Sequence, residues 1–201
     1  VISVDENHTV KEVLITPAIT GECNVSLEMF IMRTEFLKKI VQEAASKSQH
    51  SLVRDVLQGR KDEFVIKGYE HKGVFTKIDG LAAYYQANLS LLQADTRAGL
   101  FQESAPIYTK VGDNAPVKYG LESSVKNSLI ADGCVIEGSV ENCVLFRGVR
   151  IGKDAVVKNS VLMQGTHVGE KCNIERVIAD KNVLRWTVPV RASPPRAKPS
   201  L

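Results

Sequence analysis

A short hydrophobic pattern repeats through the second half of the chain, from about residue 121 to residue 183. A pair of aliphatic residues recurs every 15 to 17 residues, and single aliphatics fall between the pairs, so the finer period is close to six. The pairs align in segments 128–133, 143–148, 160–165 and 176–181. A period of six fits neither a helix nor a simple hairpin. It is typical of a parallel β-helix of hexapeptide repeats, in which each coil has three short faces.

The repeat also predicts which side chains point inward. One aliphatic on each face is expected to join a continuous column, because a single coil cannot bury its own apolar side chains. The predicted inward set is Ile130, Ile136, Leu145, Ile151, Val157, Leu162, Val168 and Ile174. Glycine, asparagine and aspartate between these positions are expected at the corners, where a positive φ is useful. The repeat predicts an architecture and no chemistry.

The first 93 residues carry the mixed patterns of an α/β segment. Alternating or clustered apolar residues predict strands at 1–4, 10–15, 25–31 and 63–66. Helical stripes follow Thr34, Ser51 and Asp79, which are predicted as N-caps. The expected domains are therefore an α/β part at 1–93, a proline-marked linker at 94–120, the β-helix at 121–183 and an irregular tail at 184–201.

The tail departs from the repeat. After Val183 the sixfold spacing stops, and four of the seven prolines arrive together with four cations and no acidic residue. From Arg185 onward we expect a disordered or loosely draped segment, because it has too little apolar content to offset its ordering entropy. The tail is either a natural extension or a sequence altered by a frameshift. Because no methionine begins the chain, we interpret it as a fragment of a longer protein.

Composition excludes several classes of function. The formal charge is +3, but without the four tail cations 22 basic residues face 23 acidic ones, so a nucleic-acid partner is not expected. No signal peptide or membrane-spanning apolar run is present, which predicts a cytoplasmic protein without a membrane partner. The four cysteines lack metal-site spacing and are interpreted as free thiols of a reducing compartment: Cys23, Cys134, Cys143 and Cys172.

Three stretches resemble one enzyme family. Residues 73–89 are similar to the family motif G-Y-W-x-D-V-G-T-x-x-x-Y-x-x-A-N-x, residues 106–109 with 116–119 to P-I-R-T…P-x-K-F, and residues 142–152 to its first solenoid coils. These motifs resemble the sugar-phosphate nucleotidyltransferases, above all bacterial glucose-1-phosphate adenylyltransferase, which makes ADP-glucose for glycogen. The resemblance covers nearly all of 10–183. The fold class it implies is an α/β segment, the C-terminal part of a nucleotidyltransferase domain, followed by a left-handed parallel β-helix.

The departures from the family pattern concern the catalytic residues. The Gly-rich nucleotide loop is absent from this chain, Thr16 stands where the family has its phosphate-binding lysine, and Lys77 stands where it has its metal-binding aspartate. Mg²⁺ prefers oxygen ligands, so an ammonium group would repel it. Asp79 as a displaced ligand is the weaker interpretation. The resemblance therefore implies a regulatory subunit that carries no catalytic residue, metal or cofactor of its own, although the family uses Mg²⁺ with ATP.

The same resemblance implies partners and leaves alternatives. The expected partner is a catalytic subunit in a hetero-tetramer. A phosphorylated effector is expected near Lys110 and Lys118, whose ammonium groups could contact its phosphate. The simpler interpretation is that both are solvated lysines of the linker without a ligand. One alternative is a fragment of a catalytically competent nucleotidyltransferase. Another is a hexapeptide-repeat acyltransferase, which would need a histidine base; the candidate, His167, is interpreted as a polar corner residue.

Overall fold

The computed structural model describes residues 1–15, 21–60, 63–183 and 190–191. The chain divides into two compact units, residues 1–72 and 73–200. The first unit contains two antiparallel strands, an α-helix and a seven-residue π-helix: β1 (Ile2–Val4), β2 (Val10–Val13), α1 (Thr34–Ser46) and η1 (Leu52–Gln58). Its described core is small, because its fully buried apolar side chains are Val13, Ile40 and Val56.

The first unit confirms some local predictions and corrects others. The Ser51 hydroxyl accepts a hydrogen bond from the Arg54 amide at 3.2 Å, so Ser51 caps η1 as predicted. Thr34 is instead the first residue of α1. The strands expected at 25–31 and 63–66 are wrong. The structure has no ladder along either segment, only isolated bridges at Asn24 and Lys67, and an alternating segment without a partner strand cannot form a sheet.

The second unit begins with two helices. They are α2 (Leu81–Ser90) and α3 (Ala94–Leu100). The N-cap of α2 is Gly80 in an extended conformation and no side chain caps it, so the predicted capping role of Asp79 is wrong. Helix α3 and the strand β3 (Lys118–Tyr119) both lie inside the range expected to be linker. Since β3 pairs with a later coil, the solenoid begins before residue 121.

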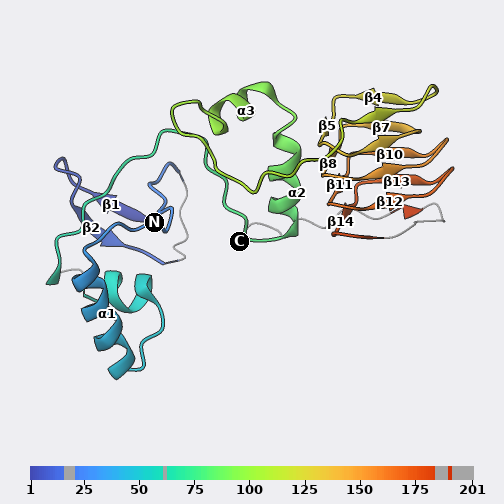
Figure 1. Ribbon diagram of the computed structural model, residues 1–201. Helices are drawn as coiled ribbons and strands as arrows, with labels where there is room; N and C mark the ends of the chain where they lie inside the picture. The colour runs from blue at the N-terminus through green and yellow to red at the C-terminus, as the bar shows by residue number, and fades with distance from the viewer. Residues whose placement is uncertain (16–20, 61–62, 184–189, 192–201) are drawn as a thin grey trace. The chain divides into compact units, whose positions relative to one another are not determined.

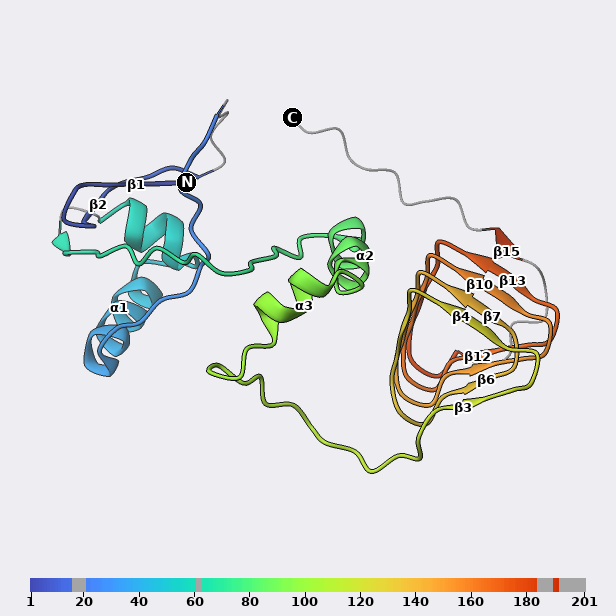
Figure 2. The same cartoon turned by 90° about the horizontal axis from the view of Figure 1, so that it is seen from above.

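The rest of the second unit is a parallel β-solenoid of about four turns, as predicted. Successive coils stack so that each face becomes a parallel sheet, and Figure 2 shows the coils superposed. The β3 sheet contains β3, β6 (Val135–Ile136), β9 (Arg150–Ile151) and β12 (His167–Val168). The β4 sheet contains β4 (Ser124–Lys126), β7 (Ser139–Glu141), β10 (Val156–Lys158), β13 (Asn173–Glu175) and β15 (Val190–Arg191). The β5 sheet contains β5 (Leu129–Ile130), β8 (Val144–Leu145), β11 (Val161–Leu162) and β14 (Ile178–Ala179).

The solenoid core follows the predicted inward column. Seven of the eight predicted side chains are at most 3% exposed, and Ile130 is half-buried because it lies in the first coil, which has no coil beyond it. The three buried cysteines join the same core.

One coil is aligned differently from the prediction. The predicted alignment of the segments places Ile178 opposite Leu162, and that match is wrong. Val161 pairs with Ile178 and Leu162 pairs with Ala179, because the 17-residue offset of the preceding β10–β13 rung continues through the coil.

The tail contributes one further rung. Val190–Arg191 pairs in parallel with β13, opposite Ile174 and Glu175. The prediction of a disordered or loosely draped segment from Arg185 onward is therefore wrong at these two residues, because backbone hydrogen bonds can extend a parallel sheet without the hexapeptide pattern. Segments 184–189 and 192–201, on which the rest of that prediction falls, lie outside the described residues.

Helix α2 covers the outside of the β5 sheet. The outward member of each aliphatic pair lies on this face, and Val144 and Val161 are only 8% and 0% exposed. Figure 1 shows α2 beside these strands, and its Tyr85 hydroxyl donates a hydrogen bond of 2.5 Å to the Asn159 carbonyl. The aliphatic pairs in the sequence thus serve two interfaces, one with the solenoid interior and one with α2.

Candidate functional site

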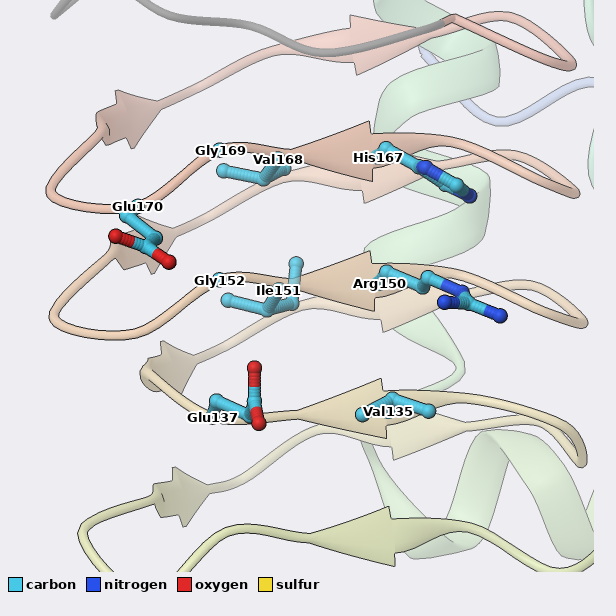
Figure 3. Close-up of a pocket in the computed structure, with 9 residues that line it drawn as sticks. All are labelled: Val135, Glu137, Arg150, Ile151, Gly152, His167, Val168, Gly169 and Glu170. Carbon is cyan, nitrogen blue, oxygen red and sulfur yellow. The ribbon is translucent and has the colours of Figure 1, made fainter.

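A polar groove lies on the outer face of the β3 sheet (Figure 3). Its volume is about 440 Å³, and it is lined by Val135, Glu137, Arg150, Ile151, Gly152, His167, Val168, Gly169 and Glu170. The pairing register of the β3 sheet determines which side chains line the groove. Val135 pairs with Arg150, which pairs with His167, so these three residues stack on one outward column. The alternating residues Ile151 and Val168 point inward and are buried.

Glycine allows two coils to pack closely at one end of this groove. Gly152 follows β9, and a Cβ atom there would lie 2.7 Å from the Glu170 amide nitrogen and 2.8 Å from the Gly169 carbonyl carbon. A side chain at Gly152 would therefore push the next coil away. The close packing of the two coils therefore requires glycine at this position.

The groove carries charges of both signs on separate sides. Arg150 and His167 project from the strands, whereas Glu137 and Glu170 lie at the corner beyond them (Figure 3). Among the residues that the structure describes, none forms a hydrogen bond or ion pair with these four side chains. His167 is half-buried on a strand, which corrects its interpretation as a corner residue. The sequence offered one signal, because the repeat offset places Arg150 and His167 on one column.

The linker is attached to another corner of the solenoid. The Asp132 carboxylate accepts hydrogen bonds from Asn114 Nδ2 at 2.7 Å and from Arg147 Nε at 3.1 Å. The hydrogen bond from Asn114 and, to a smaller extent, the one from Arg147 hold the pKa of Asp132 below its ordinary value of 3.8. Arg147 also donates from a terminal guanidinium nitrogen to the Lys110 carbonyl at 3.1 Å. These bonds fix the chain just before it enters the first coil.

The two predicted effector lysines lie in different settings. Lys110 is exposed and is held through its backbone at the Arg147 corner. Lys118 is exposed on β3 and donates its amide to the Cys134 carbonyl at 2.9 Å, which places it at the start of the column that leads to Arg150. The lining of the groove includes neither lysine. Their role in binding an effector stays a prediction.

The solenoid cysteines are structural. Cys134, Cys143 and Cys172 are buried and unbridged, and Cys23 is exposed and unbridged, as predicted. Burial raises the pKa of the Cys143 thiol to about 11 and also raises that of Cys134. A thiol with such a pKa carries almost no thiolate near neutral pH, so it is a poor nucleophile.

The sequence of this chain is similar to those of several known proteins. A family model described as "GlmU-like, C-terminal hexapeptide" matches residues 115–188. The "Glycogen biosynthesis protein GlgD" of Bacillus subtilis (strain 168) is 42% identical over 158 residues, which is 79% of this chain and 46% of that protein. The "Glucose-1-phosphate adenylyltransferase" of Geobacillus stearothermophilus is 35% identical over 165 residues, covering 79% of this chain and 42% of that protein. The resemblance to the bacterial glucose-1-phosphate adenylyltransferases is confirmed.

The matches also limit what this chain shows. A second protein named "Glycogen biosynthesis protein GlgD", from Geobacillus stearothermophilus, is 45% identical over 132 residues, or 66% of this chain and 38% of that protein. The chain thus spans less than half the length of each of these three relatives. None of the described helices is long and apolar enough to cross a membrane.

Among the described residues, the magnesium-ligand position that the adenylyltransferase resemblance implies falls at Lys77, which has no oxygen ligand to offer in its side chain. Lys77 lies in an exposed stretch before α2, and its replacement of a metal-binding carboxylate stays a prediction. Within the described ranges no three His, Cys, Asp or Glu side chains gather where they could hold a metal ion. Mg²⁺ needs oxygen ligands. Thr16, the other position predicted to be replaced, lies outside the described residues.

Proposed function

We propose that this chain is part of a regulatory subunit of glucose-1-phosphate adenylyltransferase. In that role it supports the synthesis of ADP-glucose from ATP and glucose 1-phosphate during cytoplasmic glycogen biosynthesis. The similarity to the Bacillus subtilis protein named for glycogen biosynthesis, at 42% identity over 158 residues, carries the proposal. The lysine at position 77 supports it, because the resemblance gives that position to a catalytic carboxylate.

The electrostatics of the reaction explain why this subunit would not be the catalyst. Adenylyl transfer depends on cations, with Mg²⁺ and ATP in this family, that balance the phosphates and the developing transition state. Losing one preorganised electrostatic group costs a factor of about 10² to 10³ in rate. The replacements at Lys77 and Thr16 affect two such groups, so the subunit would act through a catalytic partner in a hetero-tetramer.

An assay of the intact protein that contains this chain tests the proposal. Alone it should make almost no ADP-glucose, and mixed with the catalytic subunit it should change that subunit's rate or effector response. Lys77→Asp combined with Thr16→Lys should raise its own activity, whereas Lys153→Asp, a similar charge change at an exposed solenoid position, should not. Near-normal activity of the unmutated protein alone would establish the catalytically competent alternative instead.

The effector part of the proposal has a separate test. A phosphorylated effector that meets Lys110 and Lys118 would contact each lysine as a point charge. Lys118→Ala should then raise the effector concentration needed for half-maximal response of the assembled enzyme. An unchanged response would remove Lys118 from the proposal without affecting the regulatory role.

A further inference from the structure

We propose that the groove on the outer face of the β3 sheet binds a small dipolar ligand. Its anionic group, a carboxylate or a phosphate, lies against Arg150 and His167, and its amine lies against Glu137 and Glu170. The inference does not depend on the regulatory role, because it is carried by the charges and the shape of the groove alone.

The basic side of the groove is built for one anion. Arg150 and His167 are paired residues of adjacent parallel strands, so their Cα atoms are about 4.8 Å apart and their side chains leave the sheet on the same side. Figure 3 shows both side chains directed to the same side of the groove. A guanidinium offers two parallel N–H donors to a carboxylate or phosphate, and an imidazole adds a third donor.

The acidic side lies at the next corner of the coils. Glu137 follows β6 and Glu170 comes two residues after β12, so the two carboxylates belong to the coils on either side of Gly152 (Figure 3). Arg150 and Gly152 are two residues apart along one extended segment. Their Cα atoms are therefore about 7 Å apart along the strand direction. Figure 3 shows the side chains of Arg150 and His167 directed away from the corner of Glu137 and Glu170, so the charged groups lie farther apart than these Cα atoms.

The separation of charge selects the ligand class. The described residues form no ion pair or hydrogen bond with any of the four side chains, so their charges are not satisfied within the groove. An anion without an amine would meet repulsion from the two carboxylates, and an amine without an anion would meet repulsion from the guanidinium. A flexible molecule that carries both groups on one chain can meet both sides. The volume of about 440 Å³ lies in the range of small-molecule sites.

Matched probes test this directly on the whole chain. The dipolar probes are 6-aminohexanoate and 4-aminobutyl phosphate, in which a flexible chain joins the amine to the anionic group. Hexanoate, hexylamine and butyl phosphate each lack one of the two groups. Binding is measured by calorimetry and by shifts of the Gly152 and Gly169 amide resonances. Each dipolar probe should bind at least about ten-fold more tightly than its single-charge controls, a difference of about 1.4 kcal/mol.

Variants assign the two ends of the ligand. Arg150→Gln should weaken the dipolar probes about 10-fold to 100-fold, as expected for loss of a charge-assisted hydrogen bond. Glu137→Gln should reduce the ratio of the affinity for 6-aminohexanoate to the affinity for hexanoate. The affinity for hexanoate itself should not fall. Lys153→Gln, next to Gly152 but outside the groove lining, should change neither affinity. Preference for 4-aminobutyl phosphate over 6-aminohexanoate would identify a phosphate source, and the reverse preference a carboxylate source.

Several results would overturn the proposal. One is equal binding of dipolar and single-charge probes, and another is binding that Arg150→Gln leaves unchanged. Absence of binding at about 10 mM of every probe, where a millimolar affinity would be seen, would also refute it. If Arg150→Gln instead abolished self-association in sedimentation while no probe bound, the groove would be a contact between copies of the chain.

Discussion

The in-and-out register of the solenoid can be tested with two identical substitutions in one strand. Val156 and Val157 are neighbours in β10, where Val157 is fully buried in the column and Val156 faces outward and is half-buried. The Val→Ala substitution shortens the side chain by the equivalent of two CH₂ groups. At about 0.8 kcal/mol for each buried group the transfer loss at Val157 is about 1.6 kcal/mol. The unfilled space adds up to about 1 kcal/mol, because coils above and below restrict collapse.

Val157→Ala should therefore lower the free energy of unfolding by about 1.5–3 kcal/mol, and Val156→Ala by no more than about 1 kcal/mol. Urea unfolding of the whole chain, followed by far-UV circular dichroism, measures both. The two variants have the same composition and intrinsic strand preference, so their difference reports only the side that each residue faces. An equal or reversed cost would refute the register, since a slip of one residue exchanges inward and outward positions.

Three further outcomes follow from single contacts. Tyr85→Phe should cost about 1 kcal/mol of stability through its lost hydrogen bond to the solenoid, whereas Tyr84→Phe should cost less; equal losses in urea unfolding would contradict this. The pKa of Asp132 is lowered in the folded state, so its stabilising effect is present above 3.8 and is lost as pH falls through the lower folded value. Asp132→Asn should make the free energy of unfolding less dependent on pH in that acidic range, as measured by urea unfolding at several pH values. An unchanged pH dependence would show that Asp132 does not contribute to it. Iodoacetamide should modify Cys23 in the native protein and reach Cys143 only after unfolding, and mass spectrometry that finds both modified natively would disprove the burial argument.

The sequence by itself determined the solenoid and most of its core. Each coil repeats the same requirement for one inward aliphatic per face, so local spacing carries the information that tertiary contacts supply in other folds. Ile136, Ile151 and Val168 are buried as their spacing predicts. The family motifs in the sequence likewise sufficed to indicate the relatives that the comparisons found.

Only the tertiary structure decided how the coils align with one another and what lies outside them. Ala179 rather than Ile178 points inward, because the neighbouring rung fixes the register and overrides the preference for the larger side chain. The strand expected at 25–31 failed because alternation within a segment does not provide a partner strand. Arg150 and His167 are 17 residues apart in sequence, and their joint use depends on the stacking of two coils. A groove of this kind is a property of adjacent coils, so no single stretch of sequence contains it.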